Sequence, residues 1–165
     1  MKSISYASLR LNGGGTWAGD LEHDLVPDEV AIFFAKNGDL GQRYGVASNE
    51  RTPQFILRGL LEDPEPGVWG SVIVNRATST ETLEIAASLH PGSESVINNH
   101  LNASMKRMRS LRGIRVFGSQ FQVFFERVKA TESEQVLLHK AIDDLGDRAT
   151  LGAAWDAVRS STDNE

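Results

Sequence analysis

The chain has 165 residues, of which 40% are hydrophobic and 24% charged, a composition typical of a globular protein rather than a disordered or fibrous one. The 17 Lys and Arg residues against 22 Asp and Glu residues give a net charge of -5, which disfavours a uniformly basic nucleic-acid coat and a polybasic membrane anchor. The absence of cysteine excludes disulfides, thiolate metal sites and a cysteine nucleophile.

The hydropathy pattern favours a soluble protein. No apolar run approaches the roughly 20 residues that a bilayer span requires. The first residues also lack the apolar stretch of a signal peptide. We therefore expect a soluble, cytoplasmic protein with no membrane partner.

Positive charge is concentrated in one part of the chain. Residues 1–94 hold 7 basic and 13 acidic side chains, and residues 126–165 hold 5 and 9. Residues 95–125 hold no acidic side chain and five basic ones, Lys106, Arg107, Arg109, Arg112 and Arg115. The net charge therefore conceals a basic segment between two acidic ones.

The first 50 residues predict an N-terminal α/β segment. Residues 2–11 alternate between apolar and polar side chains up to Gly13–Gly15, which is typical of a strand followed by a turn. Pro27 and Gly38 bracket an apolar run, the pattern of a short helix. Residues 39–51 are polar and Gly-rich and predict a loop with at most a short strand near residues 44–47.

Residues 51–129 predict a second domain. Their patterns indicate helices over 53–62, 79–89 and 94–111 and a β-hairpin over 114–128. Residues 68–74 favour a strand, with the start of a helix as the alternative. Thr131 and Glu134 form a capping-box pattern, which begins a C-terminal helical pair over 130–160, followed by a frayed tail at 161–165. We recognise no internal repeat.

Three short motifs resemble the winged-helix DNA-binding domain of two-component response regulators. Residues 52–62 with Pro66-Gly67 are similar to its first helix and the turn after it, and residues 99–108 to its recognition helix. Residues 118–121 are similar to its wing, with Gln120 in place of the second glycine. The resemblance implies an α+β fold, in which a winged helix-turn-helix-like core lies between the N-terminal α/β segment and the C-terminal helical pair.

The basic segment supplies the candidate DNA-binding residues. In a winged helix the third helix enters the major groove and the hairpin contacts the adjacent backbone. Asparagine amides pair with adenine edges, while lysine and arginine suit guanine edges or phosphates. We therefore predict a DNA-binding protein, a transcriptional regulator with double-stranded DNA as its partner. Its predicted contact residues are Asn98, Asn99, Asn102, Lys106, Arg107, Arg109, Arg112, Arg115, Ser119 and Gln120.

A second hypothesis is a non-catalytic interaction protein, such as an immunity protein, an antitoxin or a phage accessory factor. Its acidic surface would bind a basic protein partner, and the basic segment would be a solvated helix face paired with acids elsewhere in the fold. Glu22-His23-Asp24 is the only metal-type cluster, and no nucleophile is paired with a base, so we predict no cofactor, no metal and no enzymatic activity. Apolar faces carrying Ile142 and Trp155 predict homodimerisation through the C-terminal helices.

Overall fold

The computed structural model describes residues 18–23, 25–112, 118–146 and 148–162, and it divides the chain into two compact units, residues 1–97 and 98–165. The boundary lies within the segment 51–129 that the sequence interpretation treats as one domain. In the described ranges every regular element is helical, and β-structure is limited to isolated bridges such as the one between Arg112 and Thr150. The predicted α+β fold class is therefore wrong, because the described chain is all-α.

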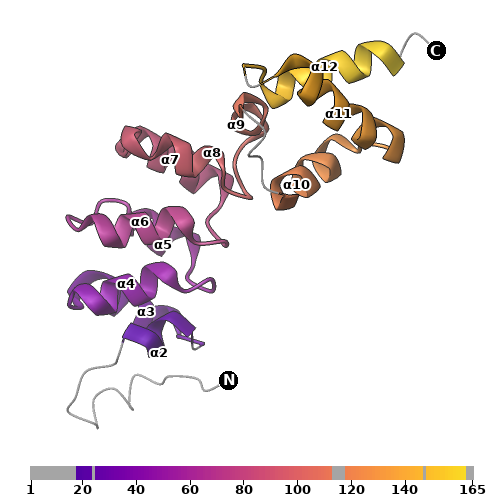
Figure 1. Cartoon of the computed structure of the whole chain (residues 1–165). Helices are drawn as coiled ribbons and strands as arrows, with labels where there is room; N and C mark the ends of the chain where they lie inside the picture. The colour runs from indigo at the N-terminus through magenta and orange to yellow at the C-terminus, as the bar shows by residue number, and fades with distance from the viewer. Residues whose placement is uncertain (1–17, 24, 113–117, 147, 163–165) are drawn as a thin grey trace. The chain divides into compact units, whose positions relative to one another are not determined.

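Unit 1 is a helical repeat with a period of 26 residues. Its elements are α2 (Ala18–His23), α3 (Asp28–Asn37), α4 (Leu40–Ser48), α5 (Gln54–Leu60), α6 (Pro66–Val74), α7 (Thr80–Leu89) and a 3₁₀ turn (Pro91–Ser93), with α8 (Glu94–Asn98) at the boundary between the units. Helices α3, α5 and α7 begin 26 residues apart, and so do α4 and α6. These helices lie in successive layers along the unit (Figure 1).

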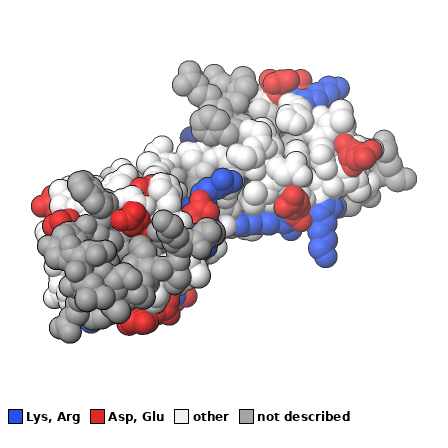
Figure 2. Space-filling model, turned by 90° about the horizontal axis from the view of Figure 1, so that it is seen from below, with Lys and Arg blue, Asp and Glu red and all other residues white. Residues whose placement is uncertain are grey.

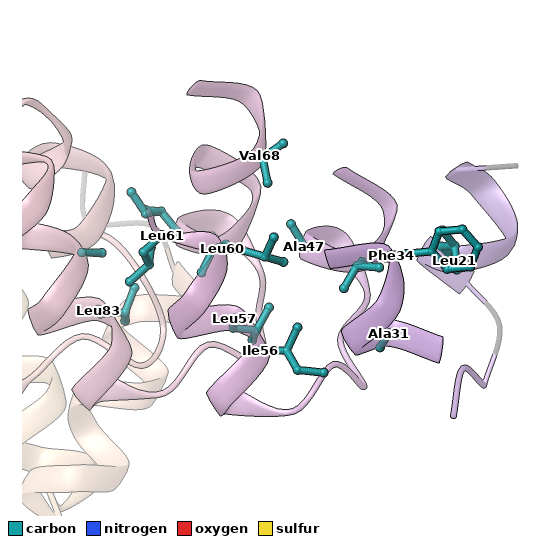
Figure 3. Close-up of a cluster of buried hydrophobic side chains, with 14 of the residues drawn as sticks. Leu21, Ala31, Phe34, Ala47, Ile56, Leu57, Leu60, Leu61, Val68 and Leu83 are labelled. Carbon is teal, nitrogen blue, oxygen red and sulfur yellow. The ribbon is translucent and has the colours of Figure 1, made fainter. Parts of the chain in front are cut away.

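Buried apolar side chains fill the space between the layers of unit 1. Leu57, Leu60 and Leu83 point between neighbouring helices in Figure 3, and each is 3% exposed or less. Removing a buried leucine side chain from such a core costs about 2–5 kcal/mol. The core also joins α2 to the rest of the unit, since Leu21 is fully buried in the same cluster.

Two segments of unit 1 differ from the sequence prediction. The predicted loop and short strand over 39–51 are wrong, because Asp39 and Gln42 form a capping box that starts α4. The strand favoured over 68–74 is also wrong, and the alternative of a helix holds, because Pro66 occupies the first turn of α6. The β-branched residues of α6 favoured a strand, but tertiary burial of that helix outweighs their propensity. The strand predicted over 2–11 lies outside the described residues.

Unit 2 comprises α9 (Met105–Ser110), α10 (Gly118–Val128), α11 (Glu132–Leu145) and α12 (Leu151–Thr162). Its core contains Phe124 of α10 against Trp155 of α12, with ring centroids 5.7 Å apart in an edge-to-face arrangement. Trp155 is 4% exposed, so this side chain belongs to the core of its own unit rather than to a free surface. Homodimerisation through the C-terminal helices stays a prediction.

The described residues of unit 2 do not form the winged-helix elements. The predicted helix over 94–111 is interrupted after Asn98, and Ser104 caps a new helix, α9, by accepting a hydrogen bond from the backbone N–H of Arg107. The hairpin predicted over 114–128 is wrong from Gly118 onward, because 118–128 is helix α10. Its apolar residues recur at three- and four-residue spacing, the period of a helix. Residues 114–117 lie outside the described residues.

Candidate functional site

Most of the amide side chains predicted to read DNA bases are engaged within unit 2. The Oδ1 atom of Asn98 accepts a hydrogen bond from Arg107 Nη1 at 2.9 Å. The Nε2 atom of Gln120 donates to the main-chain oxygen of Asn99 and, at 3.1 Å, to its Oδ1. The backbone N–H of Asn102 donates to Nδ1 of His100 at 3.0 Å. The structure thus gives these residues roles in shaping the segment between α8 and α10.

The predicted cationic residues have different surroundings. Arg109 Nη2 contacts both carboxylate oxygens of Asp156, at 2.9 and 2.7 Å. A Cβ atom at Gly152 would lie 3.0 Å from the backbone oxygen of Arg109, so glycine permits the close approach of α12 to α9. Lys106 and Arg112 are exposed, as is Ser119, whereas Arg115 lies outside the described residues.

Unit 1 has a groove between α3 and α5. It has a volume of about 380 Å³, within the range of ligand pockets. Its lining is mainly apolar with charged groups at the rim: Ile32, Ala35, Lys36, Phe55, Ile56, Gly59, Leu60, Glu62 and Asp63. An apolar floor with a few charged groups around it suits the apolar face of an amphipathic protein segment.

Two residues of α5 determine how open and how apolar the groove is. Gly59 is exposed, and a Cβ atom built there would meet no heavy atom within 4 Å, so the missing side chain leaves the groove open. Phe55 is 58% exposed, whereas the next residue of the helix, Ile56, is buried. An exposed aromatic ring beside an open groove is a common feature of protein-binding surfaces.

An ion pair fixes one end of the groove. Arg43 of α4 donates to Asp63 through Nε at 2.7 Å and through Nη2 at 3.3 Å, and its Nη1 donates to the carbonyl oxygen of Gly38. The hydrogen bond to Asp63 is the main cause that raises the pKa of Arg43 above its ordinary value. The ion pair holds the turn after α5 against α4.

Unit 1 carries most of the chain's negative charge. Residues 1–97 hold 13 acidic and 7 basic side chains, whereas residues 98–165 hold 9 and 10. Figure 2 shows mainly Asp and Glu side chains over unit 1, whereas Lys and Arg side chains lie among Asp and Glu side chains over unit 2. The exposed carboxylates of α3 and α7 and of the turn after α5 include Asp28, Glu29, Glu62 and Glu81.

The described residues contain no cluster of three or more His, Asp or Glu side chains that could hold a metal ion. Within the same ranges, no helix is both long and apolar enough to cross a bilayer. Comparison with known proteins gives no match to a family model, to a curated protein or to a solved structure.

None of the groove residues was among the predicted site residues. The sequence signal that could have found them is the 26-residue repeat, which places each exposed residue of α5 in register with residues of α3 and α7. The second signal was the glycine within a predicted helix. Glycine destabilises a helix by about 1 kcal/mol relative to alanine, so a glycine at such a position usually has a packing or functional reason.

Proposed function

We propose that the chain is a non-catalytic interaction protein whose unit 1 binds a basic protein partner. The observation that carries the proposal is the repeat architecture of unit 1 combined with its excess of acidic side chains. Stacked helical repeats present extended surfaces that many proteins use for binding, and an acidic surface attracts a basic partner over several ångströms.

The face formed by α3, α5 and α7 (the α3–α5–α7 face) is the binding surface in this proposal. It combines exposed apolar side chains with carboxylates: Phe33 is 41% exposed, Phe55 58% and Ile85 36%. Arg58 on this face is paired with Glu81, which reduces the positive charge available to repel a basic partner. Interfaces gain affinity from buried apolar anchors and orientation from the charges around them.

Selection of peptides from a random display library on the full chain tests this function. Enriched peptides should carry a net positive charge, and their affinity should fall as salt is added, because exposed charge pairs are screened. The variant pair Glu29→Lys and Glu62→Lys should weaken their binding by about tenfold. Enrichment of acidic peptides, or of none, would contradict the proposal.

Duplex DNA is a second candidate partner. The observation that favours it is the exposure of Lys106 and Arg112 beside a shallow depression lined in part by Lys106 and Arg109. Phosphate contacts of this kind make affinity fall steeply with salt. A mobility shift on random duplex DNA should then be abolished by Lys106→Ala with Arg109→Ala. Unchanged binding by that variant would remove this candidate.

A further inference from the structure

Alignment of the three equivalent helices shows where α5 departs from its neighbours. The position of Phe55 is occupied by Glu29 in α3 and by Glu81 in α7, and all three residues are exposed. An aromatic side chain therefore stands in α5 where the other two helices carry a carboxylate. This substitution places an apolar contact at a position that needs no apolar residue for folding.

The second departure lies one turn further along α5. The position of Gly59 is occupied by Phe33 in α3 and by Ile85 in α7, which are 41% and 36% exposed. Only α5 lacks a large side chain at this point, and its absence leaves the groove open between the neighbouring side chains. Together, Phe55 adds apolar surface at the edge of the groove, and Gly59 leaves the groove itself free of a side chain.

We infer that the α3–α5 groove receives an apolar side chain from the basic partner, with Gly59 as the residue that admits it. The anchor side chain lies over Gly59 against Ile32 and Phe55. The inference rests on the proposed function, and it assigns the specificity of unit 1 to one position of one repeat.

Charge at the groove selects the chemistry of the segment that carries the anchor. Glu62 lies at the rim of the groove and forms no ion pair with a described residue, whereas Asp63 is neutralised by Arg43. Lys36 lies on the α3 side of the same rim. A segment with a lysine or arginine about one helical turn from its apolar anchor therefore complements the groove.

The test compares peptide selections on three forms of the full chain: wild type, Gly59→Leu and Gly70→Leu. Leucine at position 59 projects into the groove, and its Cβ atom has open space, so the fold should be retained. Gly70 of α6 is the matched control, because a Cβ atom there also meets nothing within 4 Å and the residue does not line the groove. Both variants should melt at or above the wild-type temperature, since leucine favours a helix more than glycine does.

Peptides selected on wild type and on Gly70→Leu should share a large apolar residue flanked by basic ones. Gly59→Leu should bind these peptides at least about tenfold more weakly, as expected for the loss of a central anchor. Replacing the shared apolar residue of a peptide by alanine should weaken binding to wild type to a similar degree and leave binding to Gly59→Leu unchanged.

Two other outcomes separate the inference from the function on which it rests. Basic peptides that bind all three forms equally would overturn the groove as the anchor site and leave the acidic surface as the binding site. Failure to enrich basic peptides on any form would overturn both. Selection of peptides with an apolar anchor but no basic residue would support the groove as the anchor site and contradict a basic partner.

Discussion

Asn49 and Asn75 occupy equivalent turns of successive repeats and make the same hydrogen bonds. Each side-chain Nδ2 donates to a main-chain oxygen of the preceding repeat, Asn49 to Leu21 at 2.7 Å and Asn75 to Ala47 at 2.8 Å. Each Oδ1 accepts from the backbone N–H two residues later. Both residues are buried, so these amides connect consecutive turns where water cannot replace them.

The threonines three residues later complete the turn. Thr52 Oγ1 donates to the carbonyl oxygen of Val46 at 2.7 Å, and Thr78 Oγ1 donates to that of Val72 at 2.6 Å. Carbonyl groups at the end of a helix need such partners because the helix supplies none. The recurring Asn and Thr side chains therefore end α4 and α6 and determine the direction of the next helix.

Replacing Asn75 by leucine should destabilise unit 1 by about 1–3 kcal/mol, because it leaves the main-chain oxygens of Ala47 and Asn49 without this donor in a buried site. Hydrogen exchange of the amides in α4 and α6 measures the effect. Glu50→Gln is the control, since Glu50 is exposed in the equivalent turn and should leave the exchange unchanged. Equal protection in Asn75→Leu and wild type would contradict the role of this amide.

His100 forms a turn of the same kind in unit 2, 25 residues after Asn75. Its Nδ1 accepts from the backbone N–H of Asn102, and its main-chain oxygen accepts from Ala103. The Oδ1 of asparagine lies at the same distance along the side chain as Nδ1 of histidine. His100→Asn should therefore preserve the melting temperature of the chain, whereas His100→Leu should lower it. Equal melting temperatures of the two variants would contradict the role of Nδ1 of His100 as a hydrogen-bond acceptor.

Unit 2 should lose stability in acid through Glu134. Its carboxylate accepts from the backbone N–H of Thr131 at 2.8 Å, and this hydrogen bond is the main cause that lowers its pKa below the ordinary value of 4.5. The carboxylate favours the folded state above that value, and its contribution is lost as the pH falls through the lowered pKa. Glu134→Gln should flatten this acid dependence, measured by hydrogen exchange of α11 and α12. If the pH dependence of the exchange is unchanged in this variant, the loss of stability in acid comes from titratable groups other than Glu134.

The sequence predicted the helices whose ends carry strong signals. Pro27 and Pro53 precede α3 and α5, and the capping box of Thr131 and Glu134 begins α11 as expected. Helix α6 was missed because its three consecutive β-branched residues 72–74 resemble a strand. Helix α10 was missed because the aromatic residues near Phe124 and the glycine at 118 resemble a hairpin.

The repeat was missed for a packing reason. Equivalent core positions differ in size from one repeat to the next: Phe34, Leu60 and Ala86 share one position, and Leu21, Ala47 and Ile73 share another. Neighbouring layers fill the same space with different side chains, so apolar identity recurs at few of these positions, such as Leu57 and Leu83. The identities that do recur at this period, such as Asn49 with Asn75 and Thr52 with Thr78, are few, so the repeat is a weak signal in the sequence.

The ion pair between Arg43 and Asp63 should show strong coupling in a double-mutant cycle. The Asp63 side chain is 5% exposed, so Asp63→Ala leaves the Arg43 guanidinium without its carboxylate in a partly buried site. Adding Arg43→Met should recover part of the lost stability, because it removes the unpaired charge and keeps apolar contacts. We expect a coupling energy of about 1 kcal/mol or more. The measurement is denaturant unfolding, monitored through hydrogen exchange of the α4 amides. Additive effects of the two substitutions would show that each side chain acts separately and that the groove end is held by other contacts.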